Sequence, residues 1–370
     1  MQAEGKGAFT VNPLPVEEAM MLHAIDLHKT VLHIASMAAD GKRVQQEARL
    51  PATEQALRKY LAQWPGIRHR IVVEATGSWY WLDDFCRAEG HELVLAHPWK
   101  IRAITGAKVK TDKVDANTML TMFRLDLIPV AHKVSPGLRE ARDLMRLRLR
   151  LVGRRTSLLN SIARLLEKYN CLSIEGLPVL VQLQARFHYE QIAGVERQIR
   201  QIVRMVHRQV ARNDDVQRLL RIPGIGRINA FTIYLEIDGI DRFPAVQNFF
   251  SYSRLVPGAD NSAASVRAKR SRAGNRYLKL AFSHAAVRAV QLYPEIRDAY
   301  RKRLRKKNKP LAQAWVRKEL ARIVYYVLKD RCDFSGEFRG KPLSRTKKPQ
   351  WPLRASPSQQ LAPAGSGLGD

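Results

Sequence analysis

The fold is decided by a short apolar stretch that contains an acid near its end, LHAIDL at residues 22–27. Continuous apolar runs of about four to eight residues are typical of strands that are buried on both faces of a sheet. An acid at the end of such a strand is costly to bury unless it is paired or bound to a metal. Asp26 is therefore the first candidate site residue, although an Asp can also simply begin a turn.

The residues around this stretch predict an alternation of strands and helices. We expect further strands at 30–35, 43–48, 70–75 and 92–96, and helices at 52–63 and 79–89. The strand at 70–75 again carries an acid near its end, Glu74, for which a loop carboxylate is the alternative. Three strands, a helix, a strand, a helix, a strand and a helix is the order of the ribonuclease-H-like, or RuvC-like, α/β fold.

A helix that begins near residue 112 would complete this order and bring two more acids. It follows the basic segment GAKVKT at 106–111 and begins DKVDA, so that Asp112 and Asp115 share a helix face. Alone, this motif is more typical of an exposed capped helix with local Lys–Asp pairs than of a metal site. On the expected fold, four acids converge, and Mg²⁺ would relieve their mutual repulsion. The predicted metal site consists of Asp26, Glu74, Asp112 and Asp115.

From residue 136 the composition becomes helical and strongly basic. Apolar residues recur at intervals of three and four over 158–166 and 192–206, which predicts two long antiparallel helices in a coiled-coil arm over 136–213. The arginines between these apolar positions are equally compatible with a nucleic-acid contact and with a solvated face.

The segment PGIG at 223–226 lies between two expected helices, as in a helix-hairpin-helix turn, where backbone amides meet a DNA phosphate without reading sequence. An ordinary helix–helix turn is the alternative. A loop of small polar residues over 258–266 is followed by a basic stretch. From these segments and from the flanks of Asp112 we expect nucleic-acid contacts by Lys110, Lys113, Gly224, Gly226, Arg267, Lys269, Arg270, Arg272, Asn275 and Arg276.

The composition favours a nucleic-acid partner. With 63 Lys and Arg against 34 Asp and Glu, the formal net charge is +29 over 370 residues. A membrane partner is not expected, because no apolar run approaches the roughly 20 residues of a span and the first residues lack the apolar core of a signal peptide. The three cysteines are too widely separated for a disulfide frame or a zinc site. We expect a cytoplasmic protein.

Together, these motifs resemble the IS110-type insertion-sequence transposases, the DEDD transposases that include the IS1111 group. The segments that carry the resemblance are AID at 24–26, VEATG at 73–77, KTDKVDA at 110–116, IPGIG at 222–226, LVP at 255–257, Ser262 and GNRYL at 274–278. It covers residues 21–330 and implies a RuvC-like DEDD domain at 21–135, a coiled-coil arm at 136–213 and a mostly α-helical C-terminal transposase domain at 214–332. We expect a disordered lead-in at 1–20 and a disordered tail at 333–370.

The resemblance also implies an activity, the Mg²⁺-dependent cleavage and exchange of DNA strands. It makes Asp26, Glu74, Asp112 and Asp115 the catalytic tetrad and Ser262 the nucleophile that attaches to DNA. The family usually has Ser-Gly where this chain has Ser262-Ala263, and Ser265 is a rival nucleophile. The implied partners are double-stranded DNA of the element ends and target, a structured guide RNA encoded by the element, and further copies of the chain in a dimer or tetramer. The implied location is the bacterial cytoplasm, on the nucleoid when DNA is bound.

Two other functions remain open from the residues. A RuvC-like nuclease or resolvase would use a metal-bound water as nucleophile, and Ser262 would then be a turn residue. A non-enzymatic nucleic-acid-binding protein would use only the basic surface. Four acids in so basic a chain argue against the second, since acids near phosphate weaken simple binding.

Overall fold

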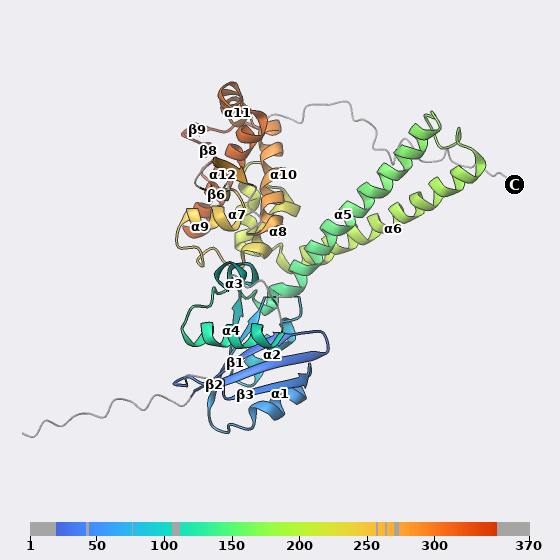
Figure 1. The fold of residues 1–370 in the computed structure, drawn as a ribbon. Coiled ribbons are helices and arrows are strands. Elements are labelled where there is room, and N and C mark those ends of the chain that lie inside the picture. The colour runs from blue at the N-terminus through green and yellow to red at the C-terminus, as the bar shows by residue number, and fades with distance from the viewer. Residues whose placement is uncertain are drawn as a thin grey trace, which may run out of the picture. The chain divides into compact units, whose positions relative to one another are not determined.

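A computed structural model describes residues 20–41, 44–75, 77–105, 112–256, 258–262, 265–269 and 274–345. Within these ranges, the side chains at 102–105, 112–115, 258–262 and 265–269 lie outside the description. The chain divides into two compact units, Met1–Lys133 and Val134–Asp370, and most of their helices and strands are labelled in Figure 1. The predicted boundary after residue 135 lies two residues from this division, and the predicted arm falls in the second unit together with the C-terminal helices.

The N-terminal unit is built on a five-stranded mixed sheet with the strand order β3-β2-β1-β4-β5. Its strands are β1 (Met20–Leu27), β2 (Val31–Ala38), β3 (Gln46–Pro51), β4 (Arg68–Glu74) and β5 (Glu92–Ala96). The first three strands are antiparallel neighbours, whereas β4 pairs with β1 and β5 pairs with β4 in parallel. This topology is compatible with the ribonuclease-H-like fold that the order of elements predicts.

Helices cover both faces of this sheet, which explains why its central strands are continuous apolar runs. One face, with Ile25 and Val73, packs against α1 (Glu54–Leu61) and α2 (Tyr80–Ala88). The opposite face, with Ala24 and Val72, packs against α4 (Asp112–Arg124), and α3 (Pro98–Thr105) contributes Ile101 to the same cluster.

A buried polar cluster joins the first two strands of this unit to α1 and β4. His23 Nδ1 lies 2.8 Å from Ser36 Oγ, which in turn lies 2.8 Å from Tyr60 Oη, and His23 Nε2 lies 2.9 Å from His69 Nδ1. Burial, together with the neighbouring His69 and His91, lowers the pKa of His23 to about 3. Burial and His91 lower the pKa of His69 to about 4. Both imidazoles are therefore neutral at neutral pH.

The C-terminal unit begins with two long helices, α5 (Pro136–Lys168) and α6 (Val179–Val210), which lie side by side along much of their length (Figure 1). The apolar stripes that predicted these helices supply the buried residues Ile162, Ile192, Val195, Ile202 and Val206. The four arginines that lie between or next to the apolar positions of α6, at 197, 200, 204 and 208, are exposed. The pairing thus buries the apolar stripes and leaves a basic outer face.

The remaining helices of this unit share one large core with the first part of α5 and the end of α6. They are α7 (Asp214–Arg221), α8 (Arg227–Ile237), α9 (Val246–Tyr252), α10 (Arg276–Leu292), α11 (Pro294–Lys306) and α12 (Lys309–Lys329). Phe231, Phe249 and Phe282 are fully buried at the centre of this core. No helix in the described part of the chain combines the length and the hydrophobicity that crossing a membrane requires.

Two expectations from the sequence are wrong in this unit. The small polar loop after residue 257 contains an antiparallel hairpin, β6 (Gly258–Ser262) and β7 (Ser265–Lys269). The tail predicted to be disordered from 333 is ordered through residue 345. There β8 (Glu337–Phe338) pairs with β9 (Lys341–Pro342), and Phe338 is only 3% exposed, with its ring 6.2 Å from that of Trp315. One buried aromatic anchors this segment despite its polar composition. Residues 1–19 and 346–370 lie outside the described residues.

Candidate active site

Two of the four predicted metal ligands come together at one edge of the sheet. Asp26 is the penultimate residue of β1, and Glu74 is the last residue of β4. These strands are parallel neighbours in which Ile25 pairs with Val73, so that Asp26 and Glu74 occupy the next step of the same register. Asp26 lies two residues after Ala24, and Glu74 lies two residues after Val72; Ala24 and Val72 both face α4. Because side chains two residues apart point to the same face of a strand, Asp26 and Glu74 are also on the face that α4 covers.

The other two predicted ligands are carried by the helix that covers this face. α4 begins at Asp112, and Asp115 lies in its first turn. Their side chains lie outside the described residues, but the backbone is informative. Ala116 and Met119, one helical turn after them, are buried against the sheet. The N-terminal turn of α4 is therefore on the same side of the sheet as Asp26 and Glu74.

The donor chemistry at this edge fits a hard divalent cation. Two half-buried carboxylates supply oxygen ligands, which Mg²⁺ prefers, and a strand end that carries an acid needs such compensation. Within the described side chains no set of three potential ligands forms a metal site. A complete site would thus need the acids of α4 in addition to Asp26 and Glu74.

A histidine that the sequence analysis missed lies beside Asp26. His28 Nε2 is 3.2 Å from Asp26 Oδ2, and the Asp26 side chain is 23% exposed. Metal-binding carboxylates commonly accept a hydrogen bond from an outer partner that fixes their orientation. The only signal in the sequence is the spacing of two residues across the strand end, which many surface histidines share.

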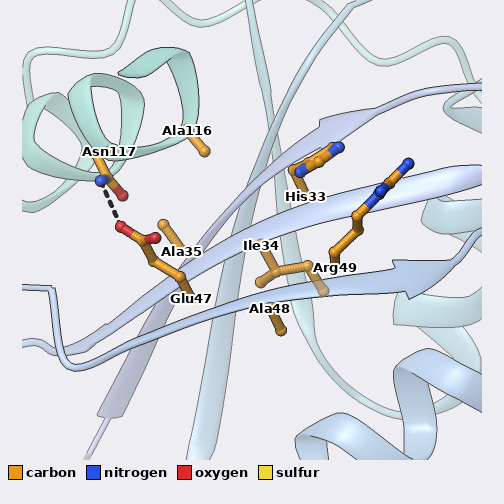
Figure 2. Close-up of a pocket in the computed structure, with 8 residues that line it drawn as sticks. All are labelled: His33, Ile34, Ala35, Glu47, Ala48, Arg49, Ala116 and Asn117. Carbon is orange, nitrogen blue, oxygen red and sulfur yellow. Dashed lines mark hydrogen bonds between the residues drawn. The ribbon is translucent and has the colours of Figure 1, made fainter. Parts of the chain in front are cut away.

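A pocket of about 250 Å³ opens on the same face of the sheet, between β2, β3 and α4 (Figure 2). Its lining residues are His33, Ile34, Ala35, Glu47, Ala48, Arg49, Ala116 and Asn117. His33 pairs in register with both Asp26 on β1 and Arg49 on β3. On the opposite side, Asn117 Nδ2 donates a 2.8 Å hydrogen bond to Glu47. The pocket therefore borders the acidic strand end, with small apolar side chains between a basic and an amide-bearing rim.

The predicted nucleophile lies in the C-terminal unit, at the closed end of the β6–β7 hairpin. Ser262 and Ser265 are backbone partners that close this hairpin. Their side chains lie outside the described residues, as do those of Lys113, Arg267 and Lys269. The predicted contacts Lys110, Arg270 and Arg272 lie outside the described residues altogether.

Hydrogen bonds join the two ends of the segment that carries this hairpin. The amide of Asn275 donates to the Tyr252 carbonyl at 2.5 Å, and Arg254 Nε donates to the Gly274 carbonyl at 2.6 Å. Gly274 has φ +92°, and a Cβ there would lie 2.6 Å from the Tyr252 oxygen. Glycine is therefore required where the segment rejoins the helical core.

Asn275 is a buried residue, whereas the sequence predicted a contact with nucleic acid. It is 8% exposed, and its Oδ1 accepts from the amides of Tyr277 and Leu278, which caps α10. Its Nδ2 donates to Glu236 Oε2 at 2.7 Å. Both ends of the amide thus serve the protein itself. Arg276, by contrast, is exposed at the start of α10.

Glu236 is a buried carboxylate that the sequence analysis did not single out. It is 3% exposed and accepts from Arg142 Nε at 3.0 Å and from Arg146 Nε and Nη2 at 2.7 and 2.8 Å. Burial alone would raise its pKa, but the hydrogen bond from Arg146 and the charges of both arginines, with the hydrogen bond from Asn275, hold the pKa below its usual value. The carboxylate is therefore ionised at neutral pH.

The two glycines of the predicted DNA-binding turn have different roles in packing. Gly224 has φ +79°, and a Cβ there would lie 2.2 Å from the Ala285 carbonyl oxygen, so this turn packs tightly on α10. Gly226 is exposed, caps α8 and has open space around it. Only Gly226 therefore leaves the N-terminal amides of a helix open to an external phosphate.

Two family models match the chain. A model of the DEDD IS110 type, described as "Transposase", matches residues 24–171, and a model described as "Transposase IS116/IS110/IS902 family" matches residues 216–301. The first range contains all four predicted metal ligands, and the second contains Ser262, Asn275 and Glu236.

Curated relatives are similar over most of the chain. A probable family 20 transposase of Pseudomonas aeruginosa is 24% identical over 76% of this chain and 84% of its own length. The transposase for insertion sequence element IS1111A of Coxiella burnetii is 25% identical over 58% of this chain and 64% of its own length. The transposase for IS1328 of Yersinia enterocolitica is 24% identical over 64% and 73%, respectively.

Proposed function

We propose, since the chain belongs to the IS110-type insertion-sequence transposases, that it cuts and exchanges DNA strands with Ser262 as nucleophile and an acidic tetrad that binds Mg²⁺. The observation that carries this proposal is the placement of Asp26 and Glu74. They lie at the same step of two parallel strands, on the face covered by the helix that begins with Asp112 and Asp115.

Each residue has a defined task in this proposal. The four carboxylates hold the metal, and His28 orients the carboxylate of Asp26. When bound, Mg²⁺ would supply Lewis-acid polarisation of the scissile phosphate and assist loss of the serine proton. Ser262 supplies the nucleophilic oxygen, which is weak without such activation.

The serine step conserves the number of phosphodiester bonds. A bond forms between Ser262 Oγ and phosphorus while the bond from phosphorus to the leaving deoxyribose oxygen breaks. That oxygen departs with the electron pair and takes up a proton, which balances the proton lost by the serine. The reverse attack by a hydroxyl of another DNA end restores the serine and joins the strands, so no ATP is needed.

The basic surface accounts for the substrates in this proposal. We propose that this surface binds the double-stranded DNA of the element ends and target and an element-encoded structured RNA. We also propose that the chain assembles into a dimer or tetramer. The net charge of +29 supplies attraction to phosphate. In this proposal, the N-terminal amides of α8 after Gly226 bind one backbone phosphate. The pocket bordered by Arg49 and His33 binds the strand next to the scissile phosphate.

The deciding experiment is to trap the intermediate. The full chain, with the RNA that copurifies with it, is incubated with end-labelled element DNA and Mg²⁺ and then denatured. A protein–DNA adduct that survives denaturation and disappears in Ser262→Ala supports the proposal. Mg²⁺-dependent cleavage without any adduct would instead establish a nuclease that uses water. Sequencing the copurified RNA tests the guide: random cellular RNA would overturn that part.

A further inference from the structure

The segment that carries Ser262 is closed at its base by the helical core. The two hydrogen bonds between Tyr252 and Asn275 and between Arg254 and Gly274 hold residues 252–254 against residues 274–275. The close approach of Gly274 to the Tyr252 carbonyl leaves no room for a side chain at this point. The two ends of the segment that carries the hairpin are thus held together by a few hydrogen-bonded or tightly packed groups.

One of these groups links the hairpin base to the long helix α5. Asn275 donates to Glu236 on α8, and Glu236 is held by Arg142 and Arg146, which lie one turn apart on α5. Arg146 also lies over the ring of Tyr277 in the first turn of α10, with 4.6 Å to the ring centre. A single buried carboxylate therefore joins α5, α8 and the residue at which the serine segment ends.

We propose that Glu236 is a positioning residue for the attack of Ser262 on DNA. Through Asn275, it holds the end of the segment that carries the β6–β7 hairpin against the long helix α5. This inference rests on the proposed function and adds a residue to it. Glu236 does not touch DNA or metal in this account. Its effect is on the orientation of the β6–β7 hairpin, and thus on the orientation of Ser262 at the closed end of that hairpin.

The composition of the cluster favours positioning over simple stabilisation. A buried carboxylate with two guanidinium groups gains little net stability over a well-packed apolar set, because desolvation offsets the attraction. What it provides is direction, since the carboxylate accepts from Arg146 by two parallel hydrogen bonds and from Arg142 and Asn275 by one each. Four directional bonds to one carboxylate define the relative placement of three helices.

The hydrogen bond from Asn275 to Glu236 can be removed while the cap of α10 is kept, because the two use different atoms of the Asn275 amide. Asn275→Asp keeps an oxygen that accepts from Tyr277 and Leu278, and Asp caps helices as well as Asn does. The variant lacks the Nδ2 donor and places a second carboxylate against Glu236. The matched control is Asn308→Asp, because Asn308 caps α12 in the same manner, through the amide of Leu311, and is exposed.

The test compares wild type, Asn275→Asp and Asn308→Asp as full chains. Three quantities are measured: the thermal unfolding midpoint, the DNA dissociation constant and the rate of covalent adduct formation at saturating DNA. We expect the adduct rate of Asn275→Asp to fall by about tenfold or more, because small misplacements of a reacting group are costly. The dissociation constant should stay within about twofold, and Asn308→Asp should match wild type in all three.

The outcomes separate this inference from the proposed function. If wild type forms no serine adduct, the proposed function fails. If wild type forms it and Asn275→Asp forms it equally fast, the positioning inference is wrong. It is also wrong if affinity and adduct rate fall together, since a general structural defect moves both. Should Asn275→Asp not fold, Asn275→Ser replaces it, with Asn308→Ser as control, because Ser also caps a helix but is too short to reach Glu236.

Discussion

Ser262 and Ser265 are backbone partners across the closed end of the β6–β7 hairpin. The two candidate nucleophiles are thus neighbours in space as well as in sequence, and one pair of variants distinguishes them. We expect Ser262→Ala to abolish the covalent protein–DNA adduct and Ser265→Ala to retain it within a few fold. Both proteins should bind DNA like wild type. An adduct that survives in Ser262→Ala and vanishes in Ser265→Ala would reassign the nucleophile.

The acids at the strand ends are expected to act on chemistry and not on folding. Asp26→Asn and Glu74→Gln should each lower strand cleavage by more than about 100-fold, since even outer partners of metal ligands are worth 10- to 100-fold. DNA affinity without Mg²⁺ should stay equal or rise, because a negative charge near phosphate is removed. Glu92→Gln is the control, since Glu92 is an exposed acid that pairs with Arg70 on the same sheet. Wild-type cleavage by Asp26→Asn in titrations with Mg²⁺ would contradict the metal site.

Arg49 is expected to contact the DNA backbone from the rim of the pocket. It is exposed, and no ion pair to it is found within the described side chains. Arg49→Ala should weaken DNA binding and reduce the slope of log affinity against log salt by about one. The control is Arg58→Ala on the opposite face of the sheet, where the guanidinium already pairs with Glu89 at 2.8 Å. An unchanged slope in Arg49→Ala would remove this residue from the interface.

The buried histidines predict a loss of stability in acid. Below pH 6.5 the unfolded chain takes up a proton that folded His23 resists until about pH 3. Because the unfolded state binds more protons over this window, the free energy of unfolding decreases as pH falls. At pH 5 this amounts to about 2 kcal/mol for His23, from 1.5 pH units at about 1.4 kcal/mol each.

The free energy of unfolding is measured by urea titration at pH 7 and at pH 5. Protease cleavage within residues 20–75 is the readout for unfolding of the N-terminal unit. His23→Gln cannot take up a proton and should flatten the dependence on pH, whereas His284→Gln, at an exposed position on α10, should keep it. Equal pH dependence in wild type and His23→Gln would show that another group is responsible.

The two turn glycines should differ in their tolerance of a methyl group. Gly224→Ala places a Cβ 2.2 Å from the Ala285 oxygen and at a positive φ, so we expect a loss of about 2 kcal/mol or more in stability. Gly226→Ala has open space and should cost under about 1 kcal/mol. Thermal unfolding of the full chain measures both. Similar midpoints for the two variants would show that the turn can shift away from α10.

The N-terminal unit was largely predictable because its strands are buried on both faces. Such strands are continuous apolar runs, and the acids that interrupt their ends, Asp26 and Glu74, stand out against them. The topology then places both acids at one edge. The pocket beside them was not predictable, because it depends on how α4 and β3 are spaced, and three of its lining residues are alanines that carry no chemical signal in the sequence.

The C-terminal unit was less predictable for two physical reasons. The β6 strand has the sequence GADNS, whose small polar residues lack any alternation of apolar and polar side chains, so backbone pairing alone defines it. Glu236 lies in the apolar run YLEI, and a single acid in such a run signals burial without identifying its partners. Those partners, Arg142 and Arg146, lie about ninety residues earlier on α5.

The joined ends of the serine segment have a consequence for variation and engineering. Because Tyr252 and Arg254 already hold Asn275 and Gly274, we expect that the residues between these anchors can change in length and sequence without altering the path of the flanking helices. Exchanging residues 257–273 between related chains, with the four anchors kept, would transfer the reactive hairpin as a cassette.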